Sequence, residues 1–437
     1  MNIIIAGAGK VGFNLAKKLS IAHNVTIIDI NSEALHRIQE NIDIMAIHGD
    51  VEDIKTYKEI KNRDIDLFIA VTNIDNTNLV SSLVADNILK IDKKIVRLKR
   101  ESFNNQNIKD SFKIDKFIFP IELASKTVSS LLMSPKANNI KYFQYTDYEL
   151  ISVMVSNDFK PTVLNQSAFK IIGIEREKEF FIPNLENIEI LPNDLVYFFG
   201  LEEDTKIIYE QLDMKSSLNI HNCVVVGGNN LGIAIANILA DAKCSVKLLE
   251  KDIALCEEAD ERLNGRVNII NTKYNSHDLF KSEALDQADI FIATTADDEF
   301  NIIQSLEAKD KGIKKVVAIN NDIEYYGLMH SLGIIAIRGP KISAYNKIME
   351  EINSSKIVVQ KNFCGSKASI CIRKVFKNSE LIGKNLKPIN SKNSRLFYIR
   401  DEILYIFKKD IILQNGDLIV LFSTKNDNKE KNWLHEL

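Results

Sequence analysis

A glycine-rich motif that directly follows a short apolar segment is the feature that most constrains the fold of this chain. Residues 3–6 are apolar, and Gly7 to Gly12 then read G-A-G-K-V-G before a segment of helical pattern. A second apolar segment, residues 25–28, ends on Asp29. A strand, a glycine turn, a helix and a second strand that ends on an acid are the parts of a dinucleotide-binding βαβ unit. We therefore predict a parallel sheet that begins at the first of these strands.

Each of these residues has a physical role in such a unit. Gly7 permits the tight turn, Gly9 allows backbone N–H groups to approach a pyrophosphate, and Gly12 allows the helix to lie close to the strand. The N-terminus of the helix adds partial positive charge. Asp29 lies where a carboxylate accepts hydrogen bonds from both ribose hydroxyls, which favours NAD(H) over NADP(H). A glycine turn without a ligand is the alternative.

Composition describes an ordinary globular chain. Of 437 residues, 45% are hydrophobic and 26% charged, and the net charge of −3 gives no reason to expect nucleic acid as a partner. No apolar run reaches the length of a membrane span, and the N-terminus lacks a signal-peptide pattern. Five cysteines show neither a CxxC motif nor the spacing of a zinc site, so we expect reduced thiols, no metal and a cytoplasmic location. They are Cys223, Cys244, Cys256, Cys364 and Cys371.

The rest of the first 138 residues continues the alternation of strands and helices. Apolar strands are predicted over 42–47, 66–72, 94–98 and 116–119, and helices over 76–89 and 122–133. Near-continuous apolar strands indicate a parallel sheet covered on both faces. Together with the glycine motif, this pattern predicts a Rossmann-like, doubly wound α/β domain.

The whole pattern then recurs. After a small α+β segment with short strands, residues 222–232 restart the glycine-motif strand and helix, 289–298 match 66–75, and 411–420 match 188–196. The predicted domains are a Rossmann-like domain over 1–138, a small α+β domain over 139–214, a second Rossmann-like domain over 219–354 and a second small domain over 356–425. Linkers are expected near 135–139, 213–219 and 353–356, followed by a polar tail over 425–431.

The two halves have diverged at the motif. Asn229 replaces Gly9, where a side chain should obstruct a pyrophosphate. Counting along the strands, Asn271-Thr272 replace Gly49-Asp50 and Ala318 replaces Arg97, whereas Glu250 keeps an acid on the second strand and Thr295 keeps the hydroxyl of Thr72. We therefore predict that the first half holds the functional site and that the second is a structural or weakly binding copy.

These motifs and the duplicated domain order resemble the tandem RCK (KTN) family of potassium-uptake regulators. The residues that carry the resemblance are Gly7–Gly12, Asp29, Gly49-Asp50 and the stretch Ala70–Asn78, which reads A-V-T-N-I-D-N-T-N. The resemblance covers nearly the full length and equates each pair of domains with an RCK-N and an RCK-C domain. It implies a nucleotide-sensing regulatory subunit that binds NAD(H), with ATP or ADP as further candidate ligands.

The resemblance also implies partners. The family's units form a homo-oligomeric cytosolic ring, here a tetramer of eight RCK units, attached to the inner face of the membrane through a separate potassium-translocating subunit of the TrkH or TrkG type. In the family, an arginine in the region of Arg97 contacts nucleotide, which makes Arg97 a candidate and leaves Arg100 as a surface residue.

Other candidate ligands follow from position. Thr72 and Asn73 come after a buried strand at the carboxyl edge of the sheet, where ligands bind, although Asn73 or Asp75 would also serve as a helix N-cap. Lys10 lies inside the glycine loop and would reach a phosphate or the solvent. The complete set of candidate cofactor ligands is Gly7, Ala8, Gly9, Lys10, Val11, Gly12, Asp29, Asp50, Val51, Thr72, Asn73, Arg97 and Glu250.

The sequence predicts no catalytic residue. The seven histidines do not cluster, and the nucleophile and metalloprotease motifs are missing. An NAD-dependent oxidoreductase, a regulator of another cation channel or antiporter, and a second messenger bound by the small domains remain alternatives. In the favoured hypothesis, a nucleotide acts by its differential affinity for two conformations. The helices after Pro120 and Pro340 are the candidates for transmitting that change.

Overall fold

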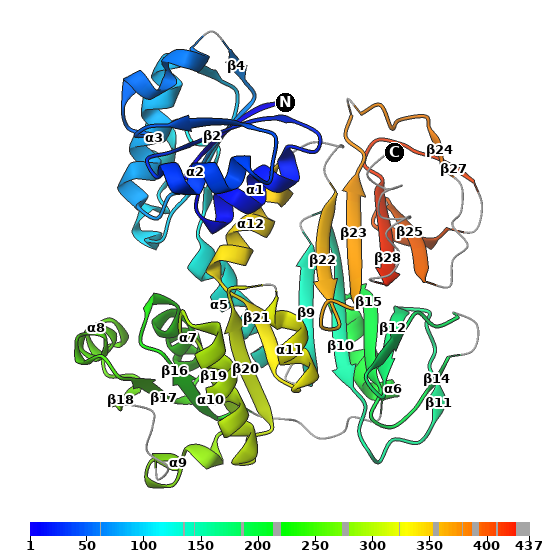
Figure 1. Cartoon of the computed structure of the whole chain (residues 1–437). Helices are drawn as coiled ribbons and strands as arrows, with labels where there is room; N and C mark the ends of the chain where they lie inside the picture. Colours follow the sequence, from blue (N-terminus) through cyan, green and yellow to red (C-terminus); the bar gives the residue numbers. More distant parts are fainter. Residues whose placement is uncertain are drawn as a thin grey trace. The chain divides into compact units, whose positions relative to one another are not determined.

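The chain forms two compact units in a computed structural model (Figure 1). The first contains Met1–Ala124 and Arg338–Ile352, and the second contains Ser125–Ile337 and Asn353–Leu437. The structure describes residues 1–61, 63–133, 136–143, 145–184, 188–212, 220–272, 279–322, 324–352, 358–377, 379–386, 393–407 and 410–424. Within these ranges, no helix combines the length and the apolar character needed to cross a membrane.

The first sheet is parallel and has the strand order β3-β2-β1-β5-β7-β8. Its inner strands are buried on both faces, as Ile3, Ile4 and Ile5 at no more than 1% exposure show. The doubly wound prediction is therefore confirmed, although the third strand begins three residues later than expected. The elements are β1 (Asn2–Ala6), α1 (Lys10–Leu19), β2 (Asn24–Asp29), α2 (Ser32–Gln39), β3 (Met45–His48), β4 (Asp64–Ile65), β5 (Leu67–Ala70), α3 (Asp75–Ile88), β6 (Lys90–Ile91), β7 (Lys94–Arg97), α4 (Gln106–Ser111), β8 (Lys116–Ile118) and α5 (Pro120–Met133).

The second large domain repeats this arrangement, with the order β18-β17-β16-β19-β20-β21. The duplication predicted from sequence is thus confirmed strand by strand. The elements are β16 (Asn222–Val226), α7 (Asn230–Asp241), β17 (Ser245–Glu250), α8 (Ile253–Leu263), β18 (Asn268–Asn271), α9 (Leu279–Ser282), β19 (Ile290–Ala293), α10 (Asp298–Asp310), β20 (Lys315–Asn320), α11 (Tyr325–Ser331), β21 (Ile335–Arg338) and α12 (Pro340–Glu351).

Strand register corrects two pairings between the halves. His48 lies opposite Asp29 and Asn271 lies opposite Glu250, so Asn271 is the counterpart of His48, and the predicted match of Asn271-Thr272 to Gly49-Asp50 was wrong by one position. Ala70 lies opposite Val96, and Ala293 lies opposite Ala318, so the counterpart of Arg97 is Ile319 and the prediction of Ala318 was wrong by one position. The amides agree with this register, since Asn78 donates to the Arg97 carbonyl and its counterpart in α10 donates to the Ile319 carbonyl. Register is set by these hydrogen bonds, which counting along a sequence does not reveal. The loss of the cation still holds, because Ile319 is also apolar.

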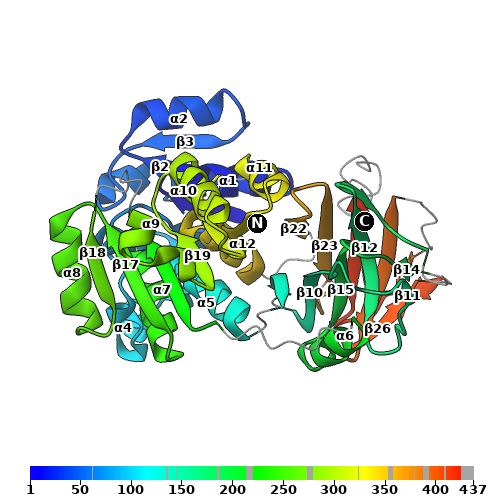
Figure 2. The same cartoon turned by 90° about the horizontal axis from the view of Figure 1, so that it is seen from below.

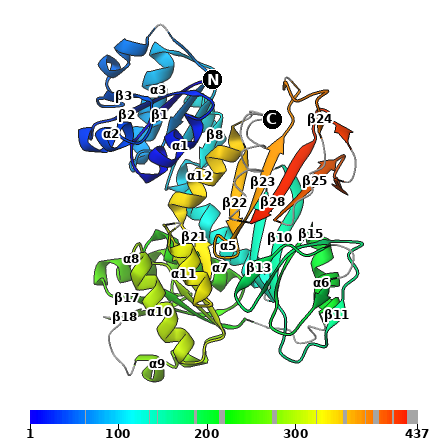
Figure 3. The ribbon, with the colours of Figure 1, turned by 45° about the vertical axis from the view of Figure 1, so that its right-hand side comes forward.

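One helix of the second half completes the first unit. Helix α12 packs on α1, as Figure 3 shows for the yellow and blue helices. Its last residue, Glu351, forms an ion pair with Lys116 at 3.4 Å, and its carbonyl accepts a 2.6 Å hydrogen bond from Lys93. The second unit in turn contains most of α5, where Lys315 donates to the Leu131 carbonyl at 3.4 Å. The two halves therefore exchange their last helices.

Each small domain contains an antiparallel sheet of five strands, ordered β13-β12-β15-β10-β9 and β22-β23-β28-β25-β26, and a separate two-stranded sheet, β11-β14 or β24-β27. Both contain the same internal brace, in which a buried aspartate accepts from an arginine: Arg176 pairs with Asp194, and Arg400 with Asp417. The predicted match of 411–420 to 188–196 is therefore confirmed. The elements are β9 (Ala137–Phe143), β10 (Thr146–Met154), β11 (Thr162–Val163), β12 (Lys170–Arg176), β13 (Glu179–Phe181), β14 (Glu189–Ile190), β15 (Leu195–Leu201), α6 (Thr205–Gln211), β22 (Val359–Phe363), β23 (Ala368–Lys374), β24 (Asn385–Leu386), β25 (Ser394–Arg400), β26 (Ile403–Ile406), β27 (Ile411–Ile412) and β28 (Leu418–Thr424).

The two small sheets share one hydrophobic core, and their green and orange strands lie side by side in Figures 1 and 2. Aromatic contacts join them, including Phe199 with Phe422 at 5.2 Å and Tyr197 with Phe363 at 5.0 Å between ring centroids. Strand β9 begins at Ala137, inside the expected linker over 135–139. The other two expected linkers and the expected tail lie outside the described residues.

A buried glutamate in β10 gives the first small domain a testable pH dependence. Burial, reinforced by the nearby Glu202 carboxylate, raises the pKa of Glu149 to about 7 from an ordinary 4.5. Because the folded state holds this proton more tightly than the unfolded state, the free energy of unfolding should fall as the pH rises from 4.5 to about 7. We expect a loss of about 1–3 kcal/mol over that window in the wild type and a flatter profile in Glu149→Gln, measured by denaturant unfolding. The exposed Glu203→Gln serves as control and should keep the wild-type slope. The same slope in Glu149→Gln would contradict the assignment.

Candidate functional site

A cavity of about 670 Å³ opens at the carboxyl edge of the first sheet. The glycine loop, the ends of β2, β5 and β7, one face of α2 and the start of α12 form its walls. The lining residues are Gly7, Ala8, Gly9, Lys10, Val11, Phe13, Asp29, Asn31, Ala34, Arg37, Ile38, Asn41, Val71, Thr72, Asn73, Arg97 and Lys341. This is the edge at which doubly wound sheets bind their ligands.

The glycine loop has the geometry expected from its sequence. Gly7 has a φ of +112°, and a Cβ there would lie 3.0 Å from the backbone nitrogen of Thr72. A Cβ on Gly12 would lie only 1.9 Å from the Gly7 carbonyl oxygen, so helix and turn are in direct contact. A Cβ on Gly9 would meet nothing within 4 Å, and no side chain caps α1. The start of α1 is therefore open toward the cavity.

Hydrogen bonds to the backbone fix the Asp29 carboxylate at the cavity wall. One oxygen accepts from the Ala8 nitrogen at 2.6 Å, and the other accepts from the Asn31 nitrogen at 2.8 Å. These two bonds hold the carboxylate between the glycine loop and α2. Each oxygen keeps further lone-pair capacity for a donor such as a hydroxyl group.

Arg97 places a buried positive charge at the same cavity. It is 7% exposed, and its Nη1 lies 3.5 Å from the Val71 carbonyl oxygen, which is a weak contact. Its Nε is buried without a hydrogen-bond partner. Burial lowers the pKa of Arg97, an effect that the nearby Asp75 carboxylate opposes. An under-satisfied guanidinium beside an open helix N-terminus is suited to an anionic ligand.

Three first-domain candidate ligands do not line this cavity: Gly12, which contacts the Gly7 carbonyl inside the loop, and Asp50 and Val51. The Asp50 carboxylate accepts from the Glu52 nitrogen at 2.9 Å, and Val51 is buried, its carbonyl accepting from Tyr57. Neither is among the lining residues, because the chain turns away after β3. The expected N-cap was also wrong, since α3 is capped by neither Asn73 nor Asp75. The Asp75 carboxylate instead accepts the backbone nitrogens of residues 99 and 100. Arg100 is exposed, as expected.

Sequence reasoning missed the α2 wall and Lys341. Ala34, Arg37 and Ile38 recur at the three- and four-residue spacing of one helix face, and Asn41 follows just after the helix ends, a signal that was available in the sequence. Lys341 carries no such signal, because it is the second residue of α12 and reaches the first domain only through the exchange of helices.

The equivalent place in the second domain is closed by its own side chains. Asn229 caps α7: its Oδ1 accepts from the nitrogens of Leu231 and Gly232 at 2.9 and 3.0 Å, and its Nδ2 donates to the Thr294 carbonyl at 2.8 Å. Glu250 is 6% exposed and accepts from three backbone nitrogens, of residues 228, 251 and 252. The side-chain oxygen of Asn229 thus accepts hydrogen bonds from the backbone N–H groups at the start of α7, which a bound phosphate would otherwise need.

Fold and loop together define a protein built from two tandem Rossmann-like domains, each followed by a small antiparallel domain. The chain belongs to the TrkA-N domain family, whose model matches residues 3–120 and again 223–340, more than half of its length. This agrees with the resemblance drawn from the glycine motif and the repeat.

Similar proteins extend over the whole chain. The Trk system potassium uptake protein TrkA of Halomonas elongata is 25% identical over 441 aligned positions, which cover 97% of this chain and 95% of the relative. A solved structure of the GsuK channel bound to NAD superposes with a TM-score of 0.60 at 14% identity, covering 100% of this chain and 79% of that one. A GsuK structure bound to ADP covers 80% of this chain and 69% of its own, with a TM-score of 0.51 at 13% identity.

The difference between Gly9 and Asn229 predicts opposite effects of exchanging them. Gly9→Asn should leave the unliganded protein as stable as the wild type or more stable by up to ~1 kcal/mol, because the side chain has open space and would cap α1. Asn229→Gly should destabilise the protein by about 1 kcal/mol through the loss of its cap and the bond to Thr294. Thermal unfolding without nucleotide measures both changes. Gly12→Ala, which must clash, shows that the assay detects damage to the loop. Equal destabilisation by Gly9→Asn and Asn229→Gly would refute this account.

Proposed function

We propose that this chain is a nucleotide-sensing regulatory subunit that binds NAD(H) in the first-domain cavity and controls a potassium-translocating membrane protein. The observation that carries the proposal is the asymmetry of the two helix N-termini. The start of α1 is uncapped beside Arg97 and Asp29, whereas the start of α7 is filled by Asn229. Of the two glycine loops, the first is therefore the one suited to a dinucleotide.

The residues around the cavity divide into two groups by the part of the ligand that they suit. The glycine loop, the start of α1 and Arg97 suit a pyrophosphate, because they offer backbone N–H groups and a buried guanidinium. Asp29 suits the two hydroxyls of a ribose and disfavours a 2′-phosphate. ATP and ADP share this adenosine diphosphate portion, so they remain alternative ligands of the same site.

Lys341 suggests how binding would be communicated. It brings a cation from α12 to the cavity wall, and the other end of α12 is anchored to the first sheet through Glu351. A nucleotide that attracts Lys341 would stabilise one position of α12, which continues into the second small domain. Because NAD and NADH differ in charge, and ATP and ADP in a phosphate, such a contact would give them different affinities for two conformations. A coupling of about 1–3 kcal/mol would change gating noticeably.

Replacing the acid at the end of β2 tests the site itself. Asp29→Ala should abolish the rise in melting temperature that NADH causes, because the ribose loses its acceptor. Asp29→Asn, which keeps an acceptor for the Ala8 nitrogen, separates loss of the ligand contact from damage to the loop. Glu250→Ala is the matched control in the second domain and should keep the NADH response. An unchanged thermal shift in Asp29→Ala, or two bound nucleotides per wild-type chain, would overturn the assignment.

Replacing Lys341 tests the proposed link to α12. Lys341→Ala should weaken NADH binding by about three- to tenfold, or ~0.7–1.4 kcal/mol, in isothermal titration calorimetry. Lys347→Ala removes a lysine from the same helix that pairs with Glu351 and does not line the cavity, so it should bind NADH as the wild type does. Equal affinities for the wild type and Lys341→Ala would exclude α12 from nucleotide recognition.

Two functional alternatives have their own tests. Turnover of NADH with a small carbonyl compound or hydroxy acid would favour an oxidoreductase over a regulator. Co-purification with a membrane protein, followed by flux measurements of potassium against sodium, would distinguish a potassium-transport regulator from a regulator of another channel or antiporter.

A further inference from the structure

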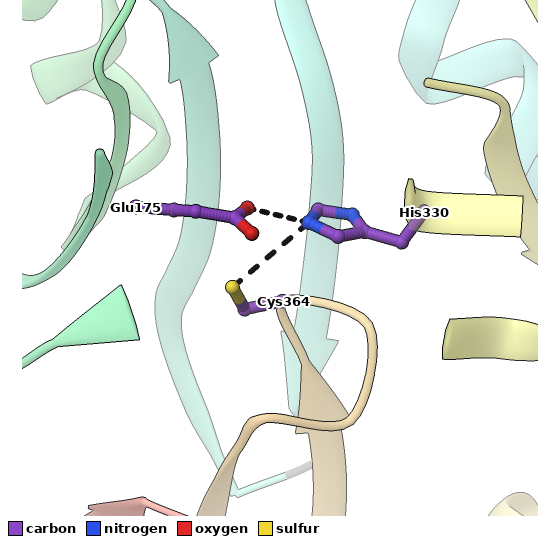
Figure 4. A group of neighbouring side chains, drawn as sticks. All are labelled: Glu175, His330 and Cys364. Carbon is purple, nitrogen blue, oxygen red and sulfur yellow. Dashed lines mark hydrogen bonds and ion pairs between the residues drawn. The ribbon is translucent and has the colours of Figure 1, made fainter. Parts of the chain in front are cut away.

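Three potential metal ligands meet at one point of the second unit (Figure 4). None of the three lines the nucleotide cavity. Glu175 is in β12, in the first small domain. His330 is in the last turn of α11, in the second Rossmann-like domain, and Cys364 follows β22 in the second small domain. Among the residues that the structure describes, this is the one group of histidine, cysteine and acidic side chains with the geometry for an ion.

The distances between the donor atoms are close to those of a zinc site. All three donors lie within 4.8 Å of one another, with 2.5 Å from His330 Nε2 to Glu175 Oε2 and 3.9 Å from His330 Nε2 to Cys364 Sγ. Tetrahedral zinc, at about 2.0–2.3 Å from nitrogen, oxygen and sulfur ligands, places its donors roughly 3.3–3.8 Å apart. The two separations from His330 Nε2 lie on either side of this range, and no two donors are more than 4.8 Å apart, so side-chain shifts of about 1 Å would admit the ion.

The surroundings hold these side chains in place. Cys364 is 2% exposed, and Glu175 is buried, its other carboxylate oxygen Oε1 accepting from Lys367. Oε2 is therefore the oxygen directed at His330, while Lys367 orients the carboxylate, as the outer partners of metal ligands do. A Cβ on Gly365 would lie 3.0 Å from the His330 ring, so glycine allows the turn that carries Cys364 to approach the histidine.

A cavity of about 630 Å³ gives access to the cluster. Its walls include all three ligands together with Tyr197 and Lys367. A three-ligand site that borders a cavity keeps a fourth coordination position for water or a small molecule.

We propose that Glu175, His330 and Cys364 form a site for Zn²⁺ or a similar borderline divalent cation, with water as the fourth ligand. The ion takes Cys364 as the thiolate, His330 through Nε2 and Glu175 through Oε2. Because the ligands come from three domains, bound metal fixes the second Rossmann-like domain to both small domains. This site does not depend on the proposed nucleotide function.

The test uses the full chain, stripped with a chelator and then titrated with CoCl₂ or ZnCl₂. We expect one Co²⁺ per chain, a near-ultraviolet sulfur-to-cobalt charge-transfer band, and a higher melting temperature with Zn²⁺. Cys364→Ser should lose the charge-transfer band, and His330→Gln should weaken Zn²⁺ binding by at least about tenfold. Cys371→Ser removes a buried thiol of the neighbouring β23 and should keep the band and the affinity.

Three results with Co²⁺ would contradict the proposed metal site. Binding of Co²⁺ to the wild type without a charge-transfer band, or a band that survives in Cys364→Ser, would overturn the proposal, as would the absence of binding. Because the band is first read in the unmodified protein, a variant that fails to fold does not remove the test. Asp29→Ala should bind Zn²⁺ as the wild type does, so failure of the nucleotide site leaves this result intact.

Discussion

The structure depends on one constraint, that a parallel sheet must be covered on both faces. The central residues of its strands are mostly apolar, so an uncovered face would expose isoleucine and valine side chains to water. In the first unit, part of the cover comes from α12, which the second half supplies and which Lys93 and Lys116 hold at Glu351. The second unit takes most of α5 in return. Neither Rossmann-like domain is complete without the other, so the duplication is an interdependent pair rather than two independent modules.

The two glycine loops show two solutions to the same electrostatic problem. A helix N-terminus has unsatisfied N–H groups that need an acceptor. In the second domain Asn229 supplies one, and Glu250 accepts from three backbone nitrogens, so the loop is satisfied without a ligand. In the first domain glycine leaves α1 without a side-chain cap, and Arg97 adds a buried Nε without a partner. The first loop has kept unsatisfied groups, which a protein retains at a cost in stability.

Local pattern predicted much of this fold. The strand order, the duplication and the placement of Gly7, Asp29, Thr72 and Arg97 at one sheet edge follow from apolar periodicity and the position of the glycine motif. Features set by hydrogen-bond register or by long-range contact were not predictable in this way. Strand pairing sets the register, and it makes Ile319 rather than Ala318 the equivalent of Arg97 in the second half. Asp50 does not reach the cavity because the chain turns away from it after β3. Lys341 and the Glu175–His330–Cys364 cluster join residues more than thirty positions apart, so spacing along the sequence carries no sign of them.

One short piece of chain, from His330 to Lys341, connects a residue of the proposed metal site with a residue of the proposed nucleotide site. His330 ends α11, Lys341 begins α12, and the short strand β21 (Ile335–Arg338) is the regular element between them. A cation at His330 and a nucleotide at Lys341 would therefore act on the two ends of one short piece of chain. Thermodynamic linkage requires that any such coupling be reciprocal: the factor by which metal changes nucleotide affinity equals the factor by which nucleotide changes metal affinity.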